Sequence, residues 1–180
     1  MNSTISIEIA APPELVFRLA RHIERWPRLL PHYVSVRVLS RRPDGRTTVR
    51  MIARRPLLGL VGFGLPVVWR ARTWAEPANL RLRFRHLGGV TAGMDVTWRI
   101  EPTGGGCHVA IEHVFRRRLP IPVLGKLFGD EVLPAFVDRF FTRPIAQRTL
   151  ATFATLAEAT AQAIAKADTS DQRPDAYPIP

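Results

Sequence analysis

Short segments in which apolar and polar residues alternate constrain the fold of this chain more than any other feature. One such segment opens the chain at residues 4–11, where Ile5, Ile7 and Ile9 alternate with Ser6 and Glu8. Alternation with a period of two places successive side chains on opposite faces of a strand. Consecutive strands of this kind indicate an antiparallel sheet with one covered face and one wet face. Six further alternating segments follow, at residues 33–41, 46–54, 67–76, 80–87, 92–101 and 107–115.

Two short helical patterns stand between the first strand and the other six. Residues 14–26 have helical spacing, and the preceding Pro12 and Pro13 suit the start of a helix, where backbone N–H groups lack partners. Residues 26–33 predict a second short helix or a turn.

The chain becomes helical again after the last strand, from about residue 130 to residue 165. Pro144 should kink this helix or divide it in two, because proline cannot donate a backbone hydrogen bond. Residues 166–180 are polar and proline-rich, so we expect a disordered tail behind one domain that covers residues 1–165. The element order predicts an α+β fold, in which a curved antiparallel sheet wraps around the long C-terminal helix and leaves a cavity between them.

The formal net charge of the chain is +11, and all but two of its 26 basic residues are arginine. Three explanations remain open: an arginine-rich proteome, an anionic membrane surface or acidic ligand, and nucleic acid. We do not expect nucleic acid, because the arginines are scattered singly along the strands. The single Cys107 excludes an internal disulfide. No stretch approaches the roughly 20 apolar residues that span a bilayer, and the N-terminus does not have the pattern of a secretory signal, so we expect a cytoplasmic protein.

Several motifs resemble one known family. They are the opening "IEIAAPPELVFRLARHIERWPRLLPHYVSVRVL", the "W-P" pair within it, the "W…A-E-P" strand and the "DVTWRIEP-TGGG" strand. Over roughly residues 3–160 the chain resembles the polyketide cyclase/dehydrase family of the START-like (SRPBCC) helix-grip superfamily. The resemblance implies a helix-grip fold with two short N-terminal helices and a deep apolar cavity that binds a flat or elongated hydrophobic molecule. Such domains serve as binders, transporters and enzymes, so the fold does not fix the activity.

In the aromatase/cyclase enzymes of that family, the strand that matches residues 69–73 carries a W-x-S-x-R pattern whose serine and arginine point inward. Trp69 matches the tryptophan, but Ala71 stands in the place of the serine and Thr73 in the place of the arginine. Strand periodicity puts these three residues on one face, and Arg70 and Arg72 on the other. We therefore expect this strand to line the cavity without acting on the ligand.

Few other polar residues share a face with the expected cavity lining. His113 lies in phase with Val109, Ile111 and Phe115 and could move protons, as could Thr73, so these two are the catalytic candidates. His86 is also in phase with apolar residues but stands at the end of its strand. Two histidines without a third ligand predict no metal site, and we expect no cofactor. The predicted ligand-binding residues are Trp26, Trp69, Ala71, Thr73, Phe84, Met94, Trp98, His113, Phe136 and Phe140.

Two loop segments combine arginines with apolar residues, at 54–66 and 115–129. They predict either a rim that touches anionic lipid, with the protein peripheral at the membrane, or loops that cover the cavity mouth or a partner subunit. The oligomeric state is left open by the sequence.

Our leading hypothesis is a binder or carrier of a polyketide, an isoprenoid quinone or a lipid-like molecule. The alternatives are a polyketide aromatase/cyclase or dehydratase, and a basic module that binds membrane surfaces.

Overall fold

The computed structural model describes residues 2–56, 64–89, 91–115 and 132–171. Its elements are β1 (Asn2–Ile9), α1 (Pro13–Arg21), the 3₁₀ helix η1 (Ile23–Arg25), α2 (Trp26–Leu29), β2 (Tyr33–Arg41), β3 (Thr47–Pro56), β4 (Gly64–Glu76), the 3₁₀ helix η2 (Pro77–Asn79), β5 (Arg81–Gly89), β6 (Met94–Thr103), β7 (Gly106–Phe115), α4 (Val132–Val137), the π-helical turn η3 (Asp138–Thr142) and α5 (Arg143–Asp171).

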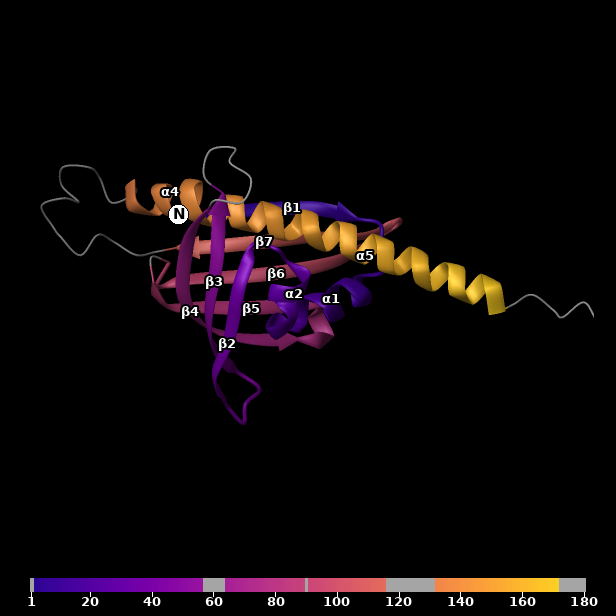
Figure 1. Cartoon of the computed structure of the whole chain (residues 1–180), viewed down its shortest axis with the longest axis horizontal. Coiled ribbons are helices and arrows are strands. Elements are labelled where there is room, and N and C mark those ends of the chain that lie inside the picture. Colours follow the sequence, from indigo (N-terminus) through magenta and orange to yellow (C-terminus); the bar gives the residue numbers. More distant parts are fainter. Residues whose placement is uncertain (1, 57–63, 90, 116–131, 172–180) are drawn as a thin grey trace, which may run out of the picture.

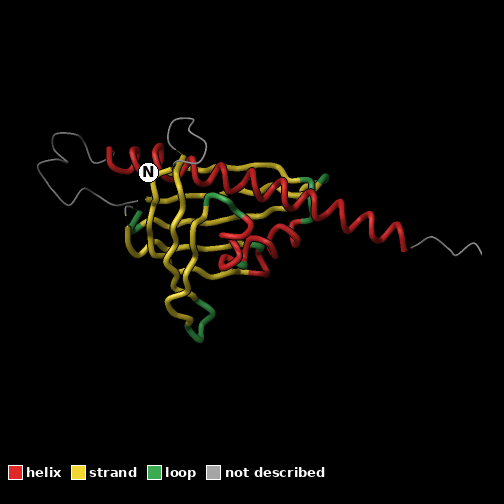
Figure 2. Tube along the Cα trace, viewed as in Figure 1, coloured by secondary structure: helices red, strands yellow, loops and turns green. Residues whose placement is uncertain are grey.

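The strands form one antiparallel sheet in the order β1-β7-β6-β5-β4-β3-β2. Strands β2 and β3 run upright in Figure 1, whereas β5, β6 and β7 lie across the view, so the sheet is strongly twisted and curled. Helix α5 runs along the sheet and continues well beyond it (Figure 1). The short helices α1 and α2 lie beside α5, away from the end that carries α4 (Figure 2). The expected helix-grip architecture, with its two short N-terminal helices, is confirmed.

The apolar face of the sheet is turned toward the helices. Every second residue of β4 is buried from Val67 to Thr73, and β6 repeats the pattern from Met94 to Ile100. Arg70 is exposed and Arg72 is half-buried on the opposite face, as strand periodicity predicts. The core therefore lies between this inner face and the helices.

The long C-terminal helix is divided by a π-helical turn that lies just before Pro144, not by a break at Pro144 itself. The backbone N–H of Arg143 donates to the carbonyl of Asp138, five residues back, and α5 starts directly after this wider turn. Because Pro144 then falls at the start of α5, its missing donor interrupts no established ladder.

The C-terminal helix is longer than the sequence pattern suggested. It runs to Asp171, so the first six residues of the expected disordered tail at 166–180 are helical. The rest of that tail, 172–180, lies outside the described residues.

Candidate functional site

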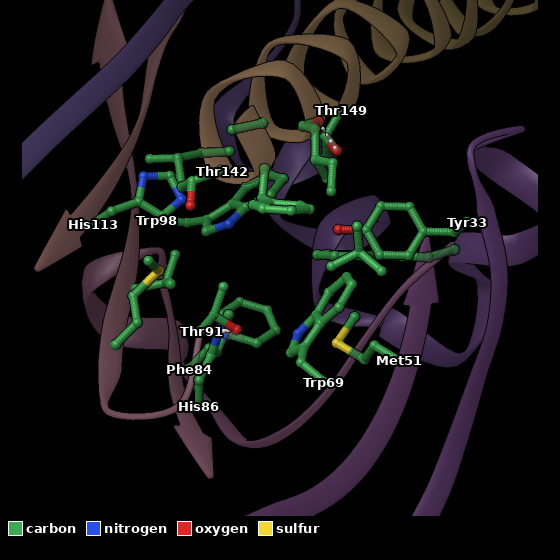
Figure 3. A pocket seen from close by; sticks show the side chains of 18 residues that line it. Tyr33, Met51, Trp69, Phe84, His86, Thr91, Trp98, His113, Thr142 and Thr149 are labelled. Carbon is green, nitrogen blue, oxygen red and sulfur yellow. Dashed lines mark hydrogen bonds between the residues drawn. The ribbon is translucent and has the colours of Figure 1, made fainter. Parts of the chain in front are cut away.

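A cavity lies between the inner face of the sheet, α2 and the start of the C-terminal helix (Figure 3). The volume of this cavity is about 70 Å³. That is room for a few water molecules, each of which needs roughly 10–15 Å³. A ligand with several rings therefore fits only after side chains move. The lining residues are Trp26, Tyr33, Met51, Val67, Trp69, Phe84, His86, Thr91, Met94, Val96, Trp98, Ile111, His113, Phe141, Thr142, Ile145, Ala146 and Thr149.

Trp26 at the start of α2 forms the floor of the cavity. Its ring lies 5.1 Å from the ring of Tyr33 and 5.5 Å from that of Trp98, measured between centroids. Its indole N–H donates to the carbonyl oxygen of Ala20 at 2.9 Å, so this donor is satisfied. Trp26 is therefore as much core as cavity wall.

Trp69 in β4 differs from Trp26 because its donor is unpaired. The side chain is only 7% exposed, and its Nε1 is buried without a hydrogen-bond partner. The ring stacks on His86 at a centroid distance of 5.9 Å, and both side chains project into the cavity from the sheet (Figure 3). A buried, unsatisfied donor is costly unless something in the cavity accepts from it.

His86 reaches the cavity at a bulge where the register between β4 and β5 shifts. The bulge leads into Gly89, whose φ of +86° and close approach to the carbonyl of Val68 exclude a side chain. The turn then brings the Thr91 hydroxyl to 2.7 Å from His86 Nδ1. Burial, and then the charge of nearby His113, lowers the pKa of His86 to about 3.

His113 enters the cavity from β7 and is only 5% exposed. Burial lowers its pKa to about 4; the carboxylate of Asp138 opposes this shift and Arg143 adds to it. Asp138 itself accepts hydrogen bonds from the Ser3 hydroxyl at 2.7 Å and from Arg143 at 3.2 Å. His113 Nδ1 is buried and has no partner.

The π-helical turn places the third unpaired group, the hydroxyl of Thr142, at the cavity (Figure 3). Thr142 Oγ1 is buried and makes no hydrogen bond. The contrast with α5 is clear, because five threonines there donate to the carbonyl four residues earlier: Thr149, Thr152, Thr155, Thr160 and Thr169.

Tyr33 and Thr149 line the side of the cavity opposite His113 (Figure 3). Thr149 Oγ1 lies 2.8 Å from Nε2 of the buried His32 and also bonds the side chain of Tyr33. Burial, and then Arg148, lowers the pKa of His32 to about 4, and burial raises the pKa of Tyr33. Both side chains are therefore neutral at pH 7.

The cavity carries no charge at neutral pH. No Asp, Glu, Lys or Arg lines it in the part of the chain that the structure describes, and its two histidines are unprotonated. Nor do the described residues include a group of three or more His, Cys, Asp or Glu side chains that could hold a metal ion. Burial raises the pKa of Cys107 to about 11, which keeps it a thiol.

Six of the ten predicted ligand-binding residues line the cavity, namely Trp26, Trp69, Phe84, Met94, Trp98 and His113. Four lie elsewhere. Ala71 is fully buried and Phe136 is 48% exposed, and the half-buried Phe140 contacts Phe136 with their ring centroids 4.6 Å apart. Thr73 lines a separate, polar pocket of about 350 Å³ between η1, the β2–β3 hairpin and β4.

The structure thus separates the two catalytic candidates, because His113 lies in the cavity and Thr73 in the second pocket. The alternation along β4 correctly predicted that Thr73 faces inward. Alternation does not, however, show where along the strand the cavity ends.

Sequence reasoning did not assign His86 or Thr142 to the cavity. His86 was in phase with Leu82 and Phe84, and that was the available signal. Nothing in the sequence pointed to Thr142, because its position depends on the π-helical turn.

The two segments predicted to form a membrane-binding rim fall mostly outside the described residues, which include only 54–56 and 64–66 of the first and Phe115 of the second. None of the described helices is long and apolar enough to cross a membrane.

A curled antiparallel sheet gripping a long C-terminal helix, with an apolar cavity between them, defines a START-like helix-grip protein. The sequence comparison narrows this class. Residues 2–158 match the model of the family described as polyketide cyclase / dehydrase and lipid transport, and the chain belongs to that family.

Individual proteins agree with this assignment. A candidate polyketide cyclase of Streptomyces halstedii is 33% identical over 101 residues, which are 56% of this chain and 87% of that protein. A crystal structure from Thermus thermophilus is 27% identical, with a TM-score of 0.66 over 89% of this chain and 99% of that one. The Zhui aromatase/cyclase of Streptomyces sp. R1128 shares the fold at 20% identity, with a TM-score of 0.66 over 88% of this chain and 93% of that one.

Proposed function

We propose that this protein binds a neutral, hydrophobic small molecule that carries ketone or hydroxyl oxygens, and that it acts as a binder or carrier. A polyketide or an isoprenoid quinone has this chemistry. A lipid-like molecule fits if its polar part is uncharged. The proposal rests on one observation: three buried polar groups without partners face an otherwise apolar, uncharged cavity, Trp69 Nε1, His113 Nδ1 and Thr142 Oγ1.

Each of these groups needs a different hydrogen-bond partner on the ligand. The indole N–H of Trp69 can only donate, so it requires an acceptor such as a carbonyl oxygen. The Thr142 hydroxyl can donate or accept, and the role of His113 Nδ1 depends on the tautomer. A molecule with two or three oxygens on a hydrophobic frame would satisfy these groups, whereas a saturated hydrocarbon would leave them unpaired.

The absence of charge argues against an anionic head group inside the cavity. A carboxylate placed there would lose its hydration without gaining a cation among the described lining residues. The family name includes lipid transport, and a fatty acid would have to keep its carboxylate at the mouth or bind protonated.

The proposal is tested by tryptophan fluorescence, since Trp26, Trp69 and Trp98 line the cavity. A neutral naphthoquinone should quench this fluorescence saturably, and the size-matched naphthoate should bind at least about tenfold more weakly. Equal binding of both compounds, or saturable binding of neither, would refute the proposal. Native mass spectrometry of the freshly purified protein, followed by extraction, would identify any molecule already bound.

Two substitutions probe the polar groups separately. Trp69→Phe removes the indole donor but keeps an aromatic ring, and Thr142→Val removes the hydroxyl at nearly constant shape. Each should weaken quinone binding by about tenfold, the effect of one buried hydrogen bond. Thr155→Val is the matched control on α5, because Thr155 is exposed and its hydroxyl is already bound to the carbonyl of Ala151.

Cyclisation of a polyketide chain is the second candidate function. It is supported by the two imidazoles that share the cavity, His86 and His113, because an aldol closure needs a group that moves protons. Their lowered pKa values make both weak bases at pH 7, so this function ranks below binding. If the protein is a cyclase, His113→Gln should abolish turnover of a reactive polyketide chain, whereas quinone binding should weaken by no more than about tenfold, as for the other two groups. Turnover that survives this substitution would remove His113 from the reaction.

A further inference from the structure

A row of three arginines crosses the outer face of the sheet on β2, β3 and β4. Arg37 is paired in register with Arg50, and Arg50 is paired with Arg70. The residues on either side of Arg50, Val49 and Met51, are fully buried on the inner face. The three guanidinium groups therefore project from adjacent strands onto the same outer surface.

Two more arginines extend this row along the strands. Arg54 lies four residues after Arg50 on β3, and Arg72 lies two residues after Arg70 on β4, both on the outer face. We refer to Arg37, Arg50, Arg54, Arg70 and Arg72 as the basic patch. Among the residues that the structure describes, none of the five forms an ion pair or a side-chain hydrogen bond.

The other half of the same outer face is arranged differently. There three of the four arginines of β5 and β6 are matched with carboxylates: Arg83 lies 3.3 Å from Glu76, Arg85 lies 2.6 Å from Asp95, and Arg99 lies 3.0 Å from Glu112. An arginine-rich composition alone does not account for this difference. The ion pairs of β2, β3 and β4 lie at the ends of the strands, as between Arg41 and Glu24, whereas the five arginines of the basic patch have no carboxylate partner among the described residues.

The basic patch does not serve the stability of the fold. Like charges directly opposite each other on neighbouring strands are destabilising. The neighbouring strand nevertheless leaves space for the side chain of Arg70. If Gly88 of β5 had a Cβ atom, that atom would lie 3.2 Å from Arg70 Nε. Because Gly88 has no side chain, the guanidinium can lie against the backbone of the neighbouring strand.

Apolar side chains lie within the basic patch. Ile52 of β3 is paired with Val68 of β4, two residues along the strands from the pair of Arg50 and Arg70. Val68 is 39% exposed. Arginine combined with aliphatic surface is typical of protein–protein contact sites. These β-branched side chains are shorter than the neighbouring arginines on the same face.

We propose that the outer face of β2, β3 and β4 docks a protein partner whose surface carries carboxylates around apolar side chains. The carboxylates would pair with the arginines, which recognise them through two parallel hydrogen bonds. The partner's apolar side chains would contact Ile52 and Val68. A lipid bilayer suits this surface less well, because membrane binding uses apolar side chains that protrude beyond the charges. Single-stranded nucleic acid is disfavoured because the patch itself has no aromatic side chain, and Trp74, farther along β4 on the same face, is covered by Arg46.

The test uses a short amphipathic helical peptide with glutamates on one face and leucines on the other, labelled for anisotropy. A second peptide of the same sequence carries glutamine in place of glutamate. The full-length protein should bind the glutamate peptide, and Arg50→Gln/Arg70→Gln should weaken this binding by about tenfold or more. The matched control, Arg83→Gln/Arg85→Gln, removes the same charge from the other half of the sheet and should stay within about twofold.

Several results would overturn the proposal. One is that neither peptide binds, or that the glutamine peptide binds as well as the glutamate peptide. Another is that both double variants weaken binding equally, which would mean that net charge alone is responsible. Tighter binding of anionic phospholipid vesicles or duplex DNA through Arg50 and Arg70 would assign the patch to a membrane or to nucleic acid instead. Amide chemical-shift changes on peptide addition should fall on β2–β4 and spare β5–β7. Near-UV circular dichroism of each variant checks that it is folded.

Discussion

The two faces of the curled sheet carry opposite chemistry, although they are built from the same strands. In β4, Val67, Trp69 and Ala71 point inward and are buried. Arg70 and Arg72 alternate with them and point outward. The inner face lines a cavity without charge, and the outer face carries arginines, some paired and some not. Strand periodicity alone thus allows a strongly basic chain to enclose a neutral binding site.

Placing a charge on the inner face should have the largest effect. Met51→Glu puts a carboxylate at a position that is 1% exposed and is paired in register with Trp69. We expect a loss of more than about 5 kcal/mol in the free energy of unfolding, or no folding at all, because the charge has no partner there. Ile52→Glu, one residue later on the outer face, should change it by less than about 1 kcal/mol. Urea unfolding at pH 7.5 measures both, and similar losses would mean that the faces are wrongly assigned.

The tryptophans give a second comparison between the faces. Trp26→Ala removes a ring that is 2% exposed and packed among four other aromatic rings, so it should lose about 3–5 kcal/mol of stability. Trp74 lies on the outer face, where Arg46 stacks over it at 5.3 Å. Trp74→Ala should lose less than about 1.5 kcal/mol. Equal losses by urea unfolding would show that the outer tryptophan is also part of the core.

Acid should lower the free energy of unfolding, because three histidines are buried in their neutral form. The pKa values of His32, His86 and His113 are about 4, 3 and 4 in the folded state and near 6.5 when unfolded. Below pH 6.5 the unfolded chain therefore binds more protons, and stability falls as the pH drops toward 4. Each histidine contributes up to about 2 kcal/mol of loss between pH 6.5 and pH 5.

The measurement is urea unfolding at a series of pH values between 7.5 and 5. His113→Gln should reduce the pH dependence of the free energy of unfolding, most strongly near pH 5, where the slope should fall by nearly one proton, or about 1.4 kcal/mol per pH unit. An unchanged slope in this variant would mean that His113 is not buried in its neutral form.

Neutralising the basic patch should have the smallest effect on stability. Arg50→Gln/Arg70→Gln relieves two like-charge contacts, so the free energy of unfolding should be unchanged or higher by about 0.5 kcal/mol. Arg85→Gln removes the ion pair with Asp95 and should lower stability slightly, by at most about 1 kcal/mol. A marked loss in the double variant would show that these arginines support the sheet rather than a partner.

The sequence was sufficient to predict the sheet, the long helix and the face on which each β4 residue lies, because these follow from local periodicity. It was not sufficient to predict how far the cavity extends along that face. Thr73 continues the inward series after Trp69 and Ala71, yet η1 and the β2–β3 hairpin border its pocket instead of the C-terminal helix. Such a boundary depends on how distant elements pack.

The C-terminal helix gives a second example of what the local sequence pattern could not predict. Phe136 and Phe140, four residues apart in the C-terminal helix, were both predicted to bind the ligand. The π-helical turn adds a residue to one turn, and each residue rotates an α-helix face by about 100°. In the structure Phe141 and Thr142 therefore line the cavity, and Phe136 lies at the surface.

That extra residue also bears on how such a domain can diversify. Deleting one residue between Asp138 and Thr142 would convert the wide turn into ordinary α-helix and re-phase everything before it. Different side chains would then face the ligand, although no strand and no other wall residue had changed. A single-residue insertion or deletion at this point is thus a compact evolutionary route from one ligand preference to another.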